Sequence, residues 1–129
     1  CNLELNRYPE DSSEVLKELY GGYAGVDKEN IVVGNGSDEM IGLVIGLNIA
    51  EGKKLLTLNP DFSKYDYYVS MHSGKMVKYN TKEDGSFDID EFIELGKKEN
   101  VDMIIFSNPN NPTGHAIEPF KITKILEEF

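Results

Sequence analysis

Residues 101–114 read VDMIIFSNPNNPTG, and this stretch does most to decide the fold. Its first half contains an apolar run without alternation, residues 103–106, which is typical of a strand buried on both faces. Its second half packs three asparagines, two prolines and a glycine into seven residues. Proline fixes the backbone φ angle and glycine frees it, so this composition predicts a rigid loop at the end of a buried strand.

Helical and extended patterns alternate on the N-terminal side of this stretch. Capping residues and apolar periodicity predict helices over 12–24, 37–49, 63–72, 88–98 and 119–129, and strands over 31–33, 54–58, 75–79 and 101–107. This order predicts an α/β fold with three layers and a mostly parallel sheet. The first eleven residues lack core periodicity, so we expect an arm over 1–11 and a folded domain over 12–129.

Composition excludes some classes of function. The formal net charge is −10, which argues against nucleic acid as a partner because phosphate contacts need basic residues. No apolar run reaches the roughly 20 residues of a membrane helix. The single cysteine, Cys1, cannot form an internal disulfide, so we expect a reducing, cytoplasmic compartment and a chain that begins inside a longer protein. No residue is assigned to a metal.

The turn at residues 34–38 reads GNGSD and precedes a predicted helix. Two glycines let the backbone approach a ligand closely, and the first N–H groups of a helix attract anions such as phosphate. An ordinary tight connection to a helix has the same composition. The turn is neither a P-loop nor a dinucleotide fingerprint, since the following lysine and the third glycine are absent.

The asparagine loop, residues 108–114, is the second candidate site. Ligands of parallel α/β sheets bind at the carboxyl ends of strands, and this loop brings amide donors there. A neutral amide can donate to a phenolate oxygen without adding charge. A simple rigid turn would also favour asparagine, proline and glycine, so the residues alone leave both interpretations open.

Four motifs together resemble those of the pyridoxal-phosphate (PLP) dependent aminotransferases of fold type I. The asparagine loop is similar to a signature loop of that class, and residues 34–39 resemble the phosphate-binding turn of its histidinol-phosphate aminotransferase branch. Residues 6–9, NRYP, resemble an N-terminal motif of the branch. Residues 60–65, PDFSKY, look like its cofactor-stacking loop, which usually has threonine where this chain has Asp61. The motifs occur in family order along essentially the whole chain.

The resemblance implies specific roles around the cofactor. Backbone amides at Gly36, Ser37 and Asp38 would hold the PLP phosphate, with the Asp38 carboxylate turned away, and Phe62 would stack on the pyridine ring. Asn111 would donate a hydrogen bond to the ring hydroxyl. Tyr8 would reach the phosphate of a neighbouring subunit, which implies a homodimer. Without the motif, Phe62 reads as a core aromatic and Tyr8 as a surface tyrosine; His72 and His115 match no motif and are expected to be solvated.

The resemblance also implies what this sequence lacks. In the family, the lysine that forms the Schiff base, the aspartate that keeps the ring nitrogen protonated and a substrate-binding arginine lie beyond residue 129. The chain would be an incomplete large domain over 12–129, without a catalytic residue and inactive alone. It would come from an enzyme of histidine biosynthesis that transfers an amino group from a small-molecule donor to a 2-oxo acid.

Two other functions stay open from the sequence. A PLP-dependent lyase, such as threonine-phosphate decarboxylase, shares the asparagine loop and a similar stacking segment. A non-catalytic, phosphate-binding α/β domain would explain the turn at 34–38 alone.

Overall fold

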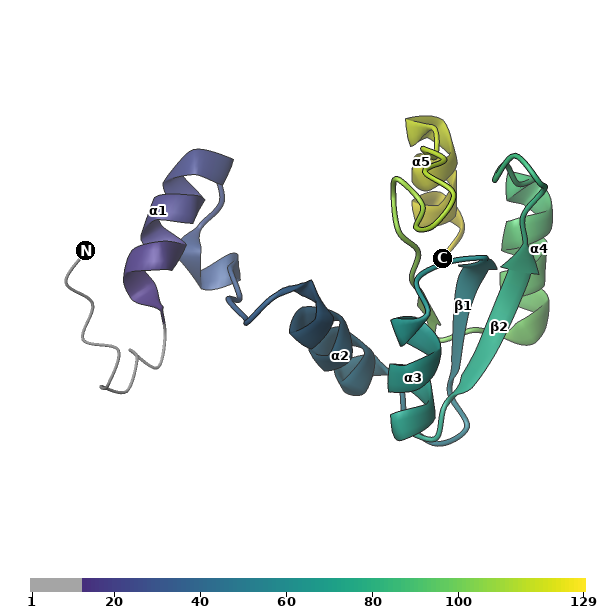
Figure 1. Ribbon diagram of the computed structural model, residues 1–129, viewed down its shortest axis with the longest axis horizontal. Helices are drawn as coiled ribbons and strands as arrows, with labels where there is room; N and C mark the ends of the chain where they lie inside the picture. The colour runs from purple at the N-terminus through teal and green to yellow at the C-terminus, as the bar shows by residue number, and fades with distance from the viewer. Residues whose placement is uncertain (1–12) are drawn as a thin grey trace. The chain divides into compact units, whose positions relative to one another are not determined.

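The computed structural model describes residues 13–129. The described part of the chain divides into two compact units, one that ends at Ser37 and one that spans Asp38–Phe129. Figure 1 follows the elements along the chain. The first unit contains helix α1 (Glu14–Ala24) and the short 3-10 helix η1 (Lys28–Asn30). The predicted helix over 12–24 is therefore confirmed within a few residues at its start.

Glycines shape the end of α1. Gly25 adopts a positive φ of 68°, and its N–H bonds the carbonyl of Gly21, which closes the helix. A Cβ atom on Gly21 would lie 2.6 Å from the carbonyl oxygen of Val26, so the turn after the helix needs glycine there. Lys28 then bonds back to Glu18 at 2.9 Å and to Glu14 at 3.1 Å, and these partners raise the pKa of the Lys28 ammonium.

Two expectations for this unit need correction or qualification. The predicted strand over 31–33 is wrong: Ile31 has extended backbone angles, but within residues 13–129 no strand pairs with this segment. An extended segment without a hydrogen-bonded neighbour cannot join a sheet. The apolar residues that recur at helical spacing on α1 are all exposed: Val15, Leu16, Leu19, Tyr20 and Tyr23.

The second unit is built on a three-stranded parallel sheet in the order β2-β1-β3. Its elements are α2 (Ser37–Asn48), β1 (Lys54–Asn59), α3 (Lys64–Met71), β2 (Lys75–Asn80), α4 (Ile89–Glu99), β3 (Met103–Ile104) and α5 (Pro119–Glu128). The sheet pairs Leu56 of β1 with Val77 of β2 and with Ile104 of β3. The expected α/β fold with a parallel sheet is confirmed.

Strand β3 is shorter and less buried than its sequence predicts. We expected a fully buried strand over 101–107, whereas only Met103–Ile104 is paired and residues 103–106 are half-buried. The reason is its position at one edge of the described sheet, where it pairs with β1 alone. One further bond, from the Ile105 N–H to the Leu56 carbonyl at 3.0 Å, leads the chain towards the asparagine loop.

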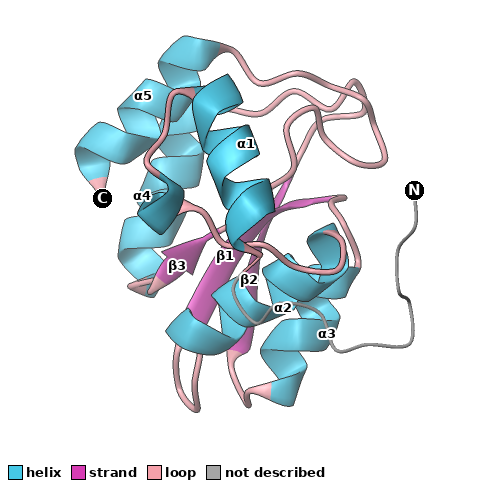
Figure 2. Cartoon of the chain, turned by 90° about the vertical axis from the view of Figure 1, so that its left-hand side faces the viewer, coloured by secondary structure: helices cyan, strands magenta, loops and turns pink. Residues whose placement is uncertain are grey.

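Helices cover both faces of the sheet, as the three-layer prediction requires (Figure 2). Neighbouring residues of β1 point to opposite faces. Leu56 and Leu58 pack with residues of α4 and α5, while Leu55 packs with residues of α2 and α3. Four consecutive β1 residues are buried, which explains why this strand lacks polar alternation.

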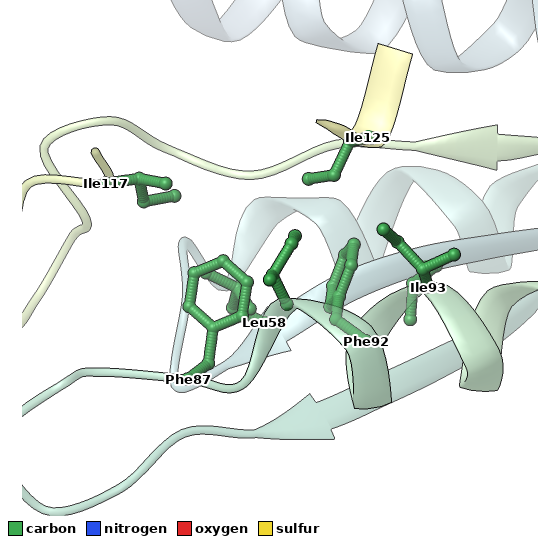
Figure 3. Close-up of a cluster of buried hydrophobic side chains, with 8 residues drawn as sticks. Leu58, Phe87, Phe92, Ile93, Ile117 and Ile125 are labelled. Carbon is green, nitrogen blue, oxygen red and sulfur yellow. The ribbon is translucent and has the colours of Figure 1, made fainter. Parts of the chain in front are cut away.

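The core on the α4/α5 face combines aliphatic side chains with a cluster of aromatic rings, of which Figure 3 shows Phe87 and Phe92. Phe92 is fully buried and its ring lies 5.5 Å from that of Phe87, 5.8 Å from that of Tyr79 and 6.4 Å from that of Phe106. Asp88 starts α4 by accepting hydrogen bonds from two backbone N–H groups of its first turn, which confirms the predicted cap. These two N–H groups lower the pKa of the Asp88 carboxyl.

The core on the α2/α3 face depends on close approach at glycines. A Cβ on Gly42 would lie 2.7 Å from the ring of Tyr68, and one on Gly46 would lie 2.8 Å from the imidazole of His72. The expectation that His72 is solvated is therefore wrong, because its ring packs half-buried against α2. Two glycines four residues apart leave one stripe of α2 without side chains, and rings from α3 fill it.

Over residues 13–129, no helix combines the length and the apolar character that crossing a bilayer would require.

Candidate functional site

Two loops meet at the carboxyl end of the parallel sheet. The first follows β1 and covers residues 59–63; the second follows β3 and contains the asparagine loop, residues 108–114. Because β1 and β3 are parallel neighbours, their ends lie at the same edge. The peptide bonds preceding Pro60, Pro109 and Pro112 are cis.

A carboxylate joins the two loops. Asp61 accepts a 2.6 Å hydrogen bond from the Ser107 hydroxyl and contacts the Ser107 N–H at 3.2 and 3.3 Å. The same carboxylate accepts the N–H of Phe62 at 2.7 Å. Ser107 Oγ in turn accepts the N–H of Asn111 at 2.7 Å. We call Asp61, Ser107 and the N–H of Asn111 the Asp61 clasp.

Asn110 forms a second connection between the loops. It is 5% exposed, and its amide donates to the Pro60 carbonyl at 3.2 Å. Its side-chain oxygen accepts from the Thr113 hydroxyl at 2.8 Å, while its backbone exchanges bonds with Gly114 and His115. A buried amide whose donor and acceptor are both satisfied holds a loop rigidly.

Asn111 differs from its neighbour because its side chain faces solvent. The residue is exposed, and within residues 13–129 its side-chain amide makes no hydrogen bond, although its backbone N–H is held by Ser107. Phe62 is half-buried and packs edge-on against the Tyr65 ring at 5.7 Å. Burial first, and then the Asp61 charge, raise the pKa of Tyr65 to about 12.

Helix α2 begins at Ser37, directly after Gly36. Gly36 has a φ of 90°, a conformation that favours glycine, and a Cβ built there would find nothing within 4 Å. Gly36 and Ser37 are both exposed, so the first turn of the helix presents its N–H groups without a covering side chain at Gly36. We had expected this turn to follow a strand of the sheet. It does not, because residues 31–33 are not paired with any strand of the described residues.

The Asp38 carboxylate turns towards α3. Its Oδ2 lies 3.4 Å from the ammonium of Lys64, which partly balances the negative charge in the first turn of α2. The other oxygen, Oδ1, is buried without a hydrogen-bond partner among residues 13–129. Burial raises the pKa of Tyr68, and the nearby Asp38 carboxylate raises it further.

The structure therefore brings three of the predicted site residues, Asp38, Phe62 and Asn111, to one edge of the second unit. Lys64 links Asp38 to the start of α3, and the Asp61 clasp links Phe62 to Asn111. Gly36 and Ser37 precede Asp38 along the chain. Tyr8 lies outside the described residues.

Sequence reasoning missed Asp61, Ser107 and Asn110, the residues that hold the loops together. One signal was present: an aspartate directly after a strand-ending proline, where the resembled family has threonine. His115 was expected to be solvated, which is wrong, because it is half-buried and its Nε2 is a buried atom without a partner among residues 13–129. A Cβ on Gly85 would lie 2.9 Å from both His115 and Thr113, so loop 82–86 packs on the asparagine loop.

Taken one by one, these groups each fit one part of a flat, anionic cofactor. An open helix start with a glycine at φ 90° suits a phosphate, a half-buried phenylalanine suits an aromatic ring, and an unpaired amide suits a ring hydroxyl. Among residues 13–129, these binding groups include no nucleophile placed next to a base.

Comparison with known proteins identifies the family of the chain. Residues 3–129 match the family described as aminotransferase class I and II. A histidinol-phosphate aminotransferase from Clostridium novyi (strain NT) is 44% identical over 125 residues, which cover 97% of this chain and 35% of that protein.

Two solved structures share the fold of this chain. The histidinol-phosphate aminotransferase from Sinorhizobium meliloti, in complex with pyridoxal-5'-phosphate, superposes with a TM-score of 0.86 at 22% identity and covers 95% of this chain and 33% of its own. The L-threonine-O-3-phosphate decarboxylase from Porphyromonas gingivalis gives a TM-score of 0.75 at 25% identity and covers 96% of this chain and 37% of its own.

The chain thus spans about 35% of the length of the curated relatives it matches. The family match covers nearly every residue. The chain belongs to the class I and II aminotransferase family.

Proposed function

We propose that the protein containing this chain is a PLP-dependent aminotransferase that acts on histidinol phosphate or a close analogue and passes the amino group to a 2-oxo acid. The observation that carries the proposal is the pairing of an aromatic ring, Phe62, with an unpaired amide, Asn111, on two loops that Asp61 ties together. The 44% identity to a histidinol-phosphate aminotransferase supports the substrate class.

In this proposal, each binding group holds one part of the cofactor. The backbone N–H groups at Gly36, Ser37 and Asp38 hold the phosphate, Phe62 stacks on the ring, and Asn111 donates to the ring hydroxyl. When bound, PLP supplies the electron sink for the reaction. The chain's own residues orient the cofactor, and residues 12–129 act as part of the cofactor-binding large domain behind the arm of residues 1–11.

The proposal extends to assembly and location. Tyr8 reaches the phosphate site of the neighbouring subunit in a homodimer, and the protein works in the cytoplasm. The apolar surface exposed on α1, with Tyr23 87% exposed, supports contacts with further protein elements.

The test uses the full-length protein and the 129-residue chain side by side. We expect the full-length protein to bind one PLP per subunit, and borohydride reduction to fix it to one lysine outside residues 1–129. The loaded protein should transfer the amino group of histidinol phosphate to a 2-oxo acid. A stoichiometric adduct on a lysine within residues 1–129 would contradict the assignment of the reactive lysine, and absence of PLP binding would contradict the function.

A second function, PLP-dependent decarboxylation of a phosphorylated amino acid, is favoured by one observation. The P. gingivalis decarboxylase shares the fold over 96% of the chain at 25% identity. Release of carbon dioxide from threonine phosphate, without amino transfer to a 2-oxo acid, would decide for this alternative.

A further inference from the structure

Asp61 is placed where one carboxylate can control both loops of the site. It follows Pro60 at the end of β1, is half-buried, and accepts from one N–H of its own loop and from two donors of Ser107. Hydrogen bonds to an ionised carboxylate are about twice as strong as those between neutral groups. The two residues are 46 positions apart, so this contact exists only through the sheet.

The Ser107 hydroxyl acts as a donor towards Asp61 and as an acceptor towards Asn111. A hydroxyl has a single hydrogen, and Ser107 donates it to Asp61 at 2.6 Å. Its lone pairs then face the N–H of Asn111, which donates to Oγ at 2.7 Å. Asp61 thereby sets the orientation of the serine, and the serine fixes the backbone from which the Asn111 amide projects.

The Asp61 carboxylate also holds the backbone of Phe62, whose ring is the proposed stacking group. Oδ1 of Asp61, the oxygen that receives the Ser107 hydroxyl, also accepts the N–H of Phe62 at 2.7 Å. One oxygen therefore holds the backbone at both proposed cofactor contacts. Loss of Asp61 releases both contacts at once. Loss of the Asn110 side chain removes the bond to the Pro60 carbonyl and the bonds from Thr113, but none of the bonds to Asp61.

We infer that Asp61 is a positioning residue for the cofactor: acting through Ser107, it sets the distance and the orientation between the ring of Phe62 and the amide of Asn111. This inference rests on the proposed function, because it assigns Asp61 to the same PLP site. Asp61 itself does not touch the cofactor in this assignment.

The experiment compares variants of the full-length, PLP-loaded protein. Asp61→Ala removes every acceptor, and Asp61→Asn keeps one carbonyl oxygen but places an NH2 group opposite the Ser107 N–H. Ser107→Ala removes the hydroxyl, and Asn111→Ala removes the proposed contact itself. Asp66→Asn is the matched control, since it neutralises an aspartate that pairs with Lys78 at 2.8 Å, away from the clasp.

The measured quantities are the dissociation constant of PLP, the visible absorbance of the bound cofactor as a function of pH, and the melting temperature. We expect Asp61→Ala to weaken PLP binding on the order of tenfold or more, and Asp61→Asn less, as fits the loss of charge-assisted hydrogen bonds. Both should shift the absorbance in the direction that Asn111→Ala shifts it. The double variant of Asp61 and Asn111 should change it by less than the sum, because the two residues act in series.

The outcomes separate the inference from the function on which it rests. If Asn111→Ala alters affinity and absorbance while Asp61→Ala lowers only the melting temperature, Asp61 is a purely structural residue and the inference is overturned. Equal effects of Asp66→Asn and Asp61→Asn would overturn it as well, because charge alone would then explain them. Failure of the unaltered protein to bind PLP would instead overturn the proposed function, and the assignment of Asp61 with it.

Discussion

The two faces of the sheet are packed in different ways. On the α4/α5 face, large side chains fill the space, and Phe92 touches three other aromatic rings. On the α2/α3 face, glycines at 42 and 46 let rings of α3 lie directly on the backbone of α2. The comparison teaches that the same sheet is covered on one face by interlocking large side chains and on the other by a helix whose glycines admit neighbouring rings against its backbone.

The asparagine loop and the loop after β1 connect the sheet to helices on its two differently packed faces. The loop after β1 leads into α3 on the glycine face, and the asparagine loop leads towards α5 on the aromatic face. The Asp61 clasp and Asn110 join them. The candidate site therefore depends on both cores, and changes in either core or at the junction test the comparison.

The largest effect is expected from Phe92→Ala. The side chain is fully buried among rings, and truncation leaves a cavity that neighbouring aromatic residues cannot fill, so we expect a loss of about 3–5 kcal/mol in the free energy of unfolding. Urea unfolding measures it. Phe120→Ala, at a residue 62% exposed on α5, is the control and should change stability little. A loss below about 1 kcal/mol at Phe92 would contradict the view that ring packing stabilises this face.

The junction between the faces is tested by two neighbouring asparagines. Asn110→Ala removes a buried amide and leaves the Pro60 carbonyl and the Thr113 hydroxyl without their partner, so we expect a loss of about 1–3 kcal/mol. Asn111→Ala, at the exposed neighbour, should cost within about 0.5 kcal/mol while weakening PLP binding. Thermal unfolding and PLP titration measured on both variants would show opposite rankings. If the same variant had the larger effect on both stability and PLP binding, the assignment of a structural role to Asn110 and a binding role to Asn111 would be wrong.

The glycine face is tested by Gly42→Ala. The added Cβ would meet the Tyr68 ring at 2.7 Å, and this overpacking outweighs the gain in helix propensity, so we expect a net loss of about 1 kcal/mol. Gly22→Ala in α1 is the matched control, because a Cβ there meets nothing within 4 Å and alanine should stabilise the helix. Urea unfolding followed by circular dichroism measures the change in stability of both variants. Stabilisation by Gly42→Ala would mean that the close approach of α2 and α3 is not required.

The smallest effect is expected from the cap of α4 on the aromatic face. Backbone N–H groups of Glu91 and Asp90 lower the pKa of Asp88 below its ordinary value of 3.8. Because the folded pKa is the lower one, the stabilisation is present above 3.8 and is lost as the pH falls through the folded pKa. Unfolding midpoints between pH 5 and about 2 should therefore drop more for the natural protein than for Asp88→Asn, which caps without titrating. If the unfolding midpoints of the two proteins fell equally with pH, the cap would not contribute to the pH dependence of stability.

The sequence predicted most helices and strands because their signals are local. Asp88 lies before an amphipathic run, and residues 54–58 form a continuous apolar stretch, so each stretch indicates its own backbone state. The glycine-rich turn and the asparagine loop were identified in the same way. Residues 31–33 show the limit of such signals, since β-branched residues favour extended backbone but cannot supply a neighbouring strand.

By itself, then, the sequence determined the α/β class, the family and the order of elements apart from the strand expected over 31–33, because these follow from periodicity, caps and motifs written within short stretches. Only the tertiary structure decided which residues hold the site together. The bond between Asp61 and Ser107 spans 46 positions and arises from the parallel register of β1 and β3. The fit of His72 against Gly46 and the burial of Asn110 are likewise set by packing between distant segments, where no local pattern can show the partner.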